Sequence, residues 1–248
     1  MSGEQMLPSF PGGTALTRLG VYDWEASDGL CGGSPHMHTA STEAYLVLAG
    51  TGQVETIRPA GHAVHDLAPG DLLWFSPGTI HRLINTDGLD LLVIMQNAGL
   101  PEAGDAVLTF PADIVGDRDN YARAALLPGP ETGTINVGKA ARARRDAAMA
   151  GYVRLKKAVL AGDASAVEEF HRDAVQLVKS RVPDWRALWS RTVAAEAVRT
   201  EEWLNALEEG DYCHLKRAAV ARSRQAPVEG SFGMCGRLHT WEPGEMAG

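Results

Sequence analysis

The chain has 248 residues, of which 45% are hydrophobic and 22% charged, so it is long enough to bury a sizeable core and has the composition of an ordinary globular protein. Its formal net charge of -8 argues against a nucleic-acid or anionic-membrane partner, since either would favour a basic surface. No secretory signal opens the sequence, no apolar run approaches the roughly 20 residues of a membrane span, and the 3 cysteines are too few for a disulfide framework. We therefore expect a cytoplasmic protein.

The first predicted strand, residues 14–24, leads through a glycine-rich loop to two histidines, His36 and His38. Histidines one residue apart point to the same side of an extended chain. Glu43 opens an apolar run, residues 43–49, which predicts the next strand. If the two strands pair, a carboxylate lies beside two imidazoles. Such a set of nitrogen and oxygen ligands suits a divalent first-row metal.

Further predicted strands follow at short intervals. Alternation and turn signals mark them at residues 53–58, 62–67, 71–75, 81–85 and 89–96. Strands at this spacing indicate an antiparallel sandwich or barrel rather than a parallel sheet. His81 stands at the head of one of them, just after the turn signal Pro77-Gly78, and is a candidate fourth ligand.

Two motifs in this region have specific spacings. The first runs His-x-His, four residues, Glu, six residues, Gly, and the second runs Gly, five residues, Ser-Pro-Gly-x-x-His, three residues, Asn. The positions are His36, His38, Glu43, Gly50, Gly70, Ser76, Pro77, Gly78, His81 and Asn85. This pair resembles the signature motifs of the cupin superfamily, which are small antiparallel β-barrels of jelly-roll type. Ser76 replaces a proline and Leu30 an opening glycine of the family pattern, and neither is a ligand.

The resemblance implies a fold that is mainly β with α: an antiparallel jelly-roll barrel over residues 14–110, followed by a helical unit. It also implies one divalent transition metal, Fe, Mn, Zn or Ni, whose ligands are His36, His38, Glu43 and His81. In octahedral geometry this set leaves two positions for water, substrate or dioxygen. Cupins commonly pair through barrel edges, so the resemblance further implies a homodimer.

The alternation of strand side chains suggests candidates for the pocket wall. Tyr45 shares a strand face with Glu43, so we expect it to project into the barrel above the metal. Trp74 and Gln96 are further candidates. Each of the three could equally be a packing residue, because small barrels fill their interiors with side chains. No other stretch of the sequence offers a clear catalytic base.

For the function, the resemblance implies a metal-dependent enzyme that acts on a small polar molecule. We favour a non-haem iron dioxygenase, because four ligands leave two adjacent positions open. Zinc, manganese or nickel would instead suit an isomerase or lyase acting on a hydroxycarbonyl compound. A non-catalytic module that binds a small ligand stays open, as does a metal that only braces the barrel, because a fold does not fix a reaction.

The second half of the chain has a different pattern. Prolines and glycines interrupt residues 111–138, which we expect to link or wrap. Apolar residues then recur at helical spacing over residues 139–210, which predicts a unit of three helices. Near its start stands an arginine cluster for which a solvated helix face is the favoured interpretation, namely Arg142, Arg144 and Arg145. The last segment, residues 211–248, is expected to add a strand packed on the barrel.

Overall fold

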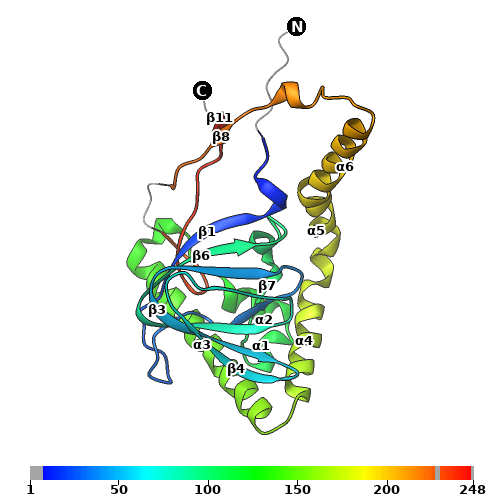
Figure 1. The fold of residues 1–248 in the computed structure, drawn as a ribbon. Helices are drawn as coiled ribbons and strands as arrows, with labels where there is room; N and C mark the ends of the chain where they lie inside the picture. Colours follow the sequence, from blue (N-terminus) through cyan, green and yellow to red (C-terminus); the bar gives the residue numbers. More distant parts are fainter. Residues whose placement is uncertain (1–7, 227–229, 247–248) are drawn as a thin grey trace.

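The computed structural model describes residues 8–226 and 230–246, so the start of the chain, to which the expectation about a secretory signal refers, lies outside the described residues. A nine-stranded sheet dominates the fold, and its pairings are antiparallel (Figure 1). Its strands are β1 (Ala15–Val21), β2 (His36–His38), β3 (Glu43–Arg58), β4 (Gly61–Leu67), β5 (Leu72–Phe75), β6 (Ile80–Met95), β7 (Ala106–Leu108), β9 (Ser231–Phe232) and β10 (Gly236–His239). Two short strands, β8 (Ala221–Arg222) and β11 (Glu245–Met246), pair separately.

Two long strands, β3 and β6, belong to both halves of the sheet. In the first half, the order of strands is β5, β3, β6, β1, β10 and β9. In the second half, the order is β4, β3, β6, β2 and β7. Strand β3 passes from one half to the other at register shifts between Val47 and Gly52, where Gly50 has a φ of 72° that favours glycine.

An apolar core lies between the inner faces of the two halves. Its members include Tyr45, Val47, Leu91 and Val93 from the first half and Val54 and Leu83 from the second. These positions alternate along each strand with outward-facing side chains, as one buried face requires. The large antiparallel sheet that the sequence predicts is therefore confirmed, whereas its closure into a jelly-roll barrel stays a prediction.

The helices are α1 (Ala112–Val115), α2 (Arg118–Ala125), α3 (Thr134–Leu160), α4 (Ser165–Val178), α5 (Val182–Trp189) and α6 (Ala195–Glu208). Helices α3 and α4 cover the outer face of the second half (Figure 1), whereas α6 contributes no residue to the apolar core there. Side chains of α3 and α4, such as Met149 and Phe170, pack with Ile57 and Ile80 of the sheet in a second apolar core. Among the described residues, no helix combines the length and the apolar character that crossing a membrane requires.

The helical region differs from its prediction in two respects. The stretch 111–138, which we expect to link or wrap, holds α1, α2 and the start of α3, so it has more regular structure than its prolines and glycines indicate. The side chain of Asp117 caps α2 by accepting a hydrogen bond from the main-chain N–H of Asn120, a local signal in a short helix that lacks a long apolar repeat. The third predicted helix is two helices, α5 and α6, which a π-helical segment at Ser190–Ala194 joins without any proline or glycine to mark the change.

The arginine cluster on α3 is largely internal, so its interpretation as a solvated helix face is wrong. Arg145 is 0% exposed and donates hydrogen bonds of 2.7 to 3.0 Å to three main-chain carbonyls within residues 24–32. Arg144 donates to the carbonyl of Gly233. Only Arg142 is exposed. Helix α3 therefore anchors two loops of the β region through these arginines. Charge patterning alone does not reveal this role.

The C-terminal segment returns to the sheet, where β10 pairs with β1. Just before β10, the main chain at Cys235 packs on Gly33, where a Cβ atom would lie 2.5 Å from Cα of Cys235. The thiol of Cys235 lies 3.8 Å from Nδ1 of His36. Parts of this predicted segment, residues 227–229 and 247–248, lie outside the described residues.

Candidate metal centre

The four predicted ligands come from three strands. His36 and His38 lie on β2, Glu43 is the first residue of β3, and His81 follows the first residue of β6. Strands β2 and β6 pair with His36 opposite His81. All four side chains are buried, and one ligand atom from each lies within 4.8 Å of the others. The structure therefore brings together the set that the two sequence motifs single out.

Each imidazole has an oxygen atom close to its Nδ1 atom. In His36 and in His81, this nitrogen lies 3.0 Å from the main-chain oxygen of the residue two positions earlier. In His38 it lies 3.3 Å from Oδ2 of Asp105. Carbonyl and carboxylate oxygens only accept hydrogen bonds, so in the neutral rings Nδ1 carries the proton and Nε2 keeps a free lone pair. Partners of this kind fix the tautomer and orientation of metal-binding histidines.

The three free Nε2 atoms face a carboxylate oxygen. Nε2 of His81 lies 3.2 Å from Nε2 of His36 and 3.1 Å from Oε2 of Glu43. Nε2 of His38 lies 3.3 Å from the same oxygen, which is buried and has no hydrogen-bond partner among the described residues. Facing lone pairs are unfavourable unless a proton or a metal ion lies between them. These residues fit a divalent metal, because one cation would satisfy all four groups.

The electrostatics of the cluster favour metal binding with release of a proton. Burial lowers the pKa of His36 well below its usual value, and the neighbouring imidazoles add to this effect. Burial alone would raise the pKa of Glu43, but the imidazoles of His81 and His38 outweigh it and hold that pKa well below its usual range. Burial would also lower the pKa of His38, yet the carboxylates of Asp105 and Glu43 raise it to about 9. A metal that binds at neutral pH would therefore displace a proton from His38.

Asp105, which contacts His38, is the residue that sequence reasoning missed. It is fully buried, and its Oδ1 accepts hydrogen bonds from the N–H groups of Thr39 (2.8 Å) and Ala40 (2.7 Å). Its Oδ2 faces the ring of His38. Asp105 thus holds both a candidate ligand and the turn that leads to Glu43. It ends a π-helical segment, Pro101–Asp105, in a stretch without periodic signal, so nothing in the sequence marks it.

We expect the variant Asp105→Asn to bind the metal about 10- to 100-fold more weakly, the usual cost of losing a partner behind a histidine ligand. The amide preserves the size of the side chain but removes the charge that holds the imidazole. Titration of metal-free protein against a chelator of known affinity measures the change. Asp113→Asn, at an exposed position of α1, is the matched control and should bind as the wild type does. An unchanged dissociation constant in Asp105→Asn would contradict the assigned role.

The three predicted pocket residues have different positions. Tyr45 is fully buried, and its ring centroid lies 6.4 Å from that of His81. The prediction for Trp74 is wrong, because this side chain is 66% exposed on the outer face of β5. Trp74 pairs with Ala44, which points away from the centre because it alternates with the ligand before it. Gln96 is also exposed, so its placement in the pocket wall is wrong as well.

In strand β5 it is Phe75, and not Trp74, that faces the candidate metal centre. It pairs with Glu43, and its ring centroid lies 4.3 Å from that of His81 and 5.4 Å from that of Tyr45. The alternation of β5 alone does not reveal which of two neighbours faces inward. The pairing register with β3 decides between them.

The helical unit contacts the turn that precedes His81. Nε2 of His171, on α4, lies 2.9 Å from the main-chain oxygen of Gly78. The N–H of Gly78 in turn donates a hydrogen bond of 2.9 Å to the main-chain oxygen of His38. Helix α4 thus braces the main chain at two of the candidate ligands without entering the centre.

Part of the chain matches a known protein family. Residues 26–95 match the family model described as Cupin domain. Similar solved structures include the Streptomyces nucleoside dehydratase Pac13, with 15% identity over 40% of this chain and 70% of that chain and a TM-score of 0.31. A cupin protein from Bacteroides fragilis has 21% identity over 35% of this chain and 65% of that chain, with a TM-score of 0.26. No curated protein matches the sequence. Residues 26–95 therefore match a cupin domain, and all four candidate ligands lie inside that segment.

Proposed function

We propose that the protein is a metal-dependent enzyme acting on a small polar molecule, and that it is a non-haem iron dioxygenase. The observation that supports this is the buried cluster of three Nε2 atoms and one carboxylate oxygen. His36, His38, Glu43 and His81 would hold the metal. A bound iron(II) would supply Lewis acidity and an electron for reaction with dioxygen.

The wall of the centre combines apolar side chains with one hydroxyl group. Phe75 and two residues that pair with strand β3 near the ligands, Val93 and Met95, would keep bulk water from the reacting molecule. The hydroxyl of Tyr45 is buried and has no hydrogen-bond partner among the described residues. Burial, reinforced by the charge of Glu43, raises the pKa of Tyr45 well above its usual value, so the phenol stays protonated. Tyr45 would donate a hydrogen bond to an oxygen atom of the substrate.

An isomerase or lyase acting on a hydroxycarbonyl compound is the alternative. Such a reaction needs a group that moves a proton. Among the described residues, the carboxylates in contact with the imidazoles are Glu43, itself a candidate ligand, and Asp105, which is bonded to the main chain behind His38. Neither is free to act as a base, and this favours the dioxygenase. In a non-catalytic binding module, Tyr45 would be a packing residue only.

Metal content and oxygen consumption distinguish these functions. Protein purified without added metal should contain about one iron per chain by elemental analysis, and it should consume dioxygen with a small diol or thiol substrate. Zinc, manganese or nickel together with no oxygen consumption after reconstitution with iron(II) would support the isomerase or lyase. Protein that binds none of these metals would overturn the proposal.

The variant Tyr45→Phe separates catalysis from metal binding. We expect it to keep the wild-type metal content and to lose about 100-fold in turnover, the lower end of what a positioned proton donor contributes. Tyr22→Phe is a suitable control, since Tyr22 is also buried but donates its hydroxyl to the main-chain oxygen of Gly233. Steady-state oxygen consumption measures the turnover of both variants. If Tyr45→Phe kept the wild-type turnover, Tyr45 would be a packing residue only.

A further inference from the structure

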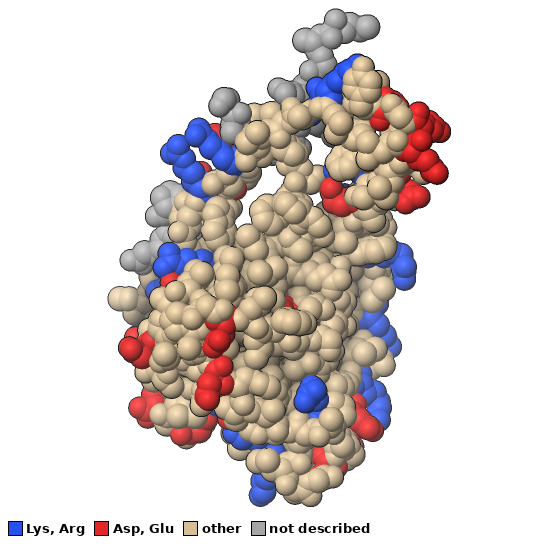
Figure 2. Space-filling model, in the orientation of Figure 1, with Lys and Arg blue, Asp and Glu red and all other residues tan. Residues whose placement is uncertain are grey.

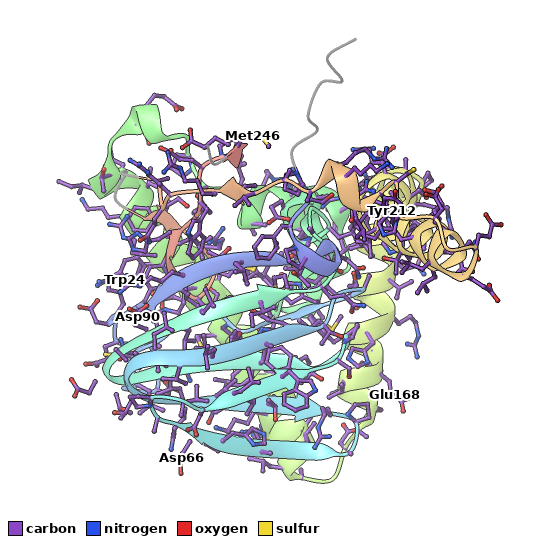
Figure 3. The ribbon with its side chains drawn as sticks, turned by 45° about the horizontal axis from the view of Figure 1, so that its top comes forward. Trp24, Asp66, Asp90, Glu168, Tyr212 and Met246 are labelled. Atoms are coloured by element: carbon purple, nitrogen blue, oxygen red, sulfur yellow. The ribbon has the colours of Figure 1, made fainter. Side chains whose placement is uncertain are left out.

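One further histidine, His65, faces the interior of the sheet near the candidate metal centre, although it is not part of the ligand cluster. It lies on β4, two residues before Leu67, which belongs to the apolar core between the two halves. Its neighbours Val64 and Asp66 are exposed, and Figure 3 shows Asp66 at the margin of the sheet. Because strand side chains alternate, His65 points to the same side as Leu67, towards the inner face.

Thr56 lies between His65 and the candidate ligands. The register of the second half places Thr56 of β3 opposite His81 of β6, and His81 opposite His36 of β2. Residues paired in this way have their Cβ atoms about 4.5 to 5.5 Å apart on one face of a sheet. Thr56 is 4% exposed, and its hydroxyl lies 3.3 Å from Nε2 of His65. A hydroxyl group therefore stands in the same row as two candidate ligands, with an imidazole behind it.

The hydroxyl of Thr56 has capacity for a further partner. A hydroxyl group carries one proton and two lone pairs, and the contact with His65 uses one of these three. On β4, the residue paired with Thr56 is Ala63, whose side chain is a single methyl group without hydrogen-bonding atoms. Thr56 can therefore exchange a hydrogen bond with a molecule in the centre.

His65 can gain and lose a proton more freely than the imidazoles of the cluster. Within the described part of the chain it forms no ion pair with a carboxylate, in contrast to His38 and His81. The residue opposite it on β3 is Val54, which is apolar. His65 is half-buried, so water reaches its ring, whereas His81 is 0% exposed. A proton taken up by His65 can therefore pass to solvent.

We propose that Thr56 and His65 form a proton relay that deprotonates an uncharged thiol or diol in the candidate metal centre. The S–H or O–H bond of the substrate breaks, its proton goes to Oγ1 of Thr56, and the proton of that hydroxyl goes to Nε2 of His65. The sulfur or oxygen atom keeps the electron pair and becomes an anion, the form in which such groups bind metals. The imidazolium of His65 then releases the proton to water. The relay rests on the proposed function, in which such a molecule reacts at the metal.

The charges of the protein favour a substrate that arrives uncharged. The net charge of -8 repels anions. In the view of Figure 2, few charged side chains lie over the strands, so no cluster of lysine and arginine offsets this repulsion there. A neutral thiol or diol avoids the repulsion, and a proton acceptor inside the centre then produces the anion where the metal would stabilise it. An isomerase would use the same relay, so oxygen consumption still decides between the two reactions.

The rate at which a thiol binds tests the relay without any turnover. Cobalt(II)-loaded protein is mixed with 2-mercaptoethanol in the absence of oxygen, and stopped-flow absorbance of the cobalt gives both the binding rate and the Kd. The variant His65→Gln keeps a hydrogen-bonding group beside Thr56 but cannot accept a proton. It should bind the thiol about 100-fold more slowly, the lower end of what a positioned proton-transfer group contributes. Its Kd should change little, because a relay alters the rate of proton transfer and not the equilibrium.

Variants on the same two strands control for this effect. His62→Gln changes a histidine of β4 that lies 3.7 Å from Glu55 and not beside Thr56, and it should bind the thiol at the wild-type rate. Thr56→Val removes the hydroxyl and should be as slow as His65→Gln, whereas Thr56→Ser keeps the hydroxyl and should stay close to the wild type. Cobalt content verifies that each variant is folded around an intact centre.

The outcomes separate the relay from the proposed function. A wild-type binding rate in His65→Gln or in Thr56→Val would overturn the relay alone. A Kd that rises in proportion as the rate falls would also overturn it, since the two residues would then bind the thiol without moving its proton. Wild-type protein that binds cobalt(II) but no thiol would overturn the proposed function and the relay with it.

Discussion

Replacing His81 with alanine should abolish metal binding and the share of thermal stability that depends on it. Nε2 of His81 lies within 3.2 Å of ligand atoms of both His36 and Glu43, so its loss removes a central member of the cluster. A metal that binds only the folded state stabilises it by about 4 kcal/mol when its concentration is a thousand times the Kd. The Tm of wild-type protein should therefore fall when a chelator removes the metal. The Tm of His81→Ala should be the same with and without metal.

His65→Ala is the matched control for this experiment. His65 lies on β4, where Nε2 is 3.3 Å from the hydroxyl of Thr56, and it is not part of the cluster. This variant should keep the wild-type metal content by inductively coupled plasma mass spectrometry, and its Tm should still respond to the chelator. Full metal content in His81→Ala would show that the site assignment is wrong, whatever its effect on stability.

The sequence predicts the ligand set of this centre better than its surroundings. His36, His38 and Glu43 lie close together in the chain, and a turn motif marks His81, so short-range spacing is enough to select them. Asp105 reaches His38 only through the folded chain, and no local pattern marks it. Phe75 lines the centre where the sequence predicts Trp74, because the register of β5 with β3 determines which face of β5 points inward. Contacts that depend on tertiary pairing are therefore those that the sequence does not reveal.

The same limit applies to the fold. Alternation along the strands predicts the antiparallel sheet, because each strand buries one face and the pattern is visible within a few residues. The division of the last predicted helix at Ser190–Ala194 has no such mark, since neither proline nor glycine stands there. The buried position of Arg145 is equally hidden, because its partners are main-chain carbonyls of a distant loop, and any sequence has those.

The variant Gly151→Ala should destabilise the protein by about 2 kcal/mol, although the same substitution usually stabilises a helix by about 1 kcal/mol. Gly151 lies on α3, where a Cβ atom would come within 2.1 Å of the main-chain oxygen of Thr109 and 2.7 Å of the carbonyl of Phe110. Neither contact can be relieved by a side-chain rotation. The helix would have to shift away from the sheet, which loosens the core and costs about 1 to 3 kcal/mol for overpacking, or more where the backbone must move.

Urea unfolding measures this effect, and a second glycine variant controls for it. Gly20→Ala, in β1, places its Cβ atom where no atom lies within 4 Å, so its free energy of unfolding should stay within about 0.5 kcal/mol of the wild type. The N–H of Thr109 also donates a hydrogen bond to the main-chain oxygen of Pro35, and its hydroxyl donates one to that of Ala148, so Thr109 ties the chain beside His36 to α3. A displaced helix should therefore weaken metal binding in Gly151→Ala as well. If Gly151→Ala were as stable as the wild type, the close approach of α3 to the sheet would not be what holds the helical unit in place.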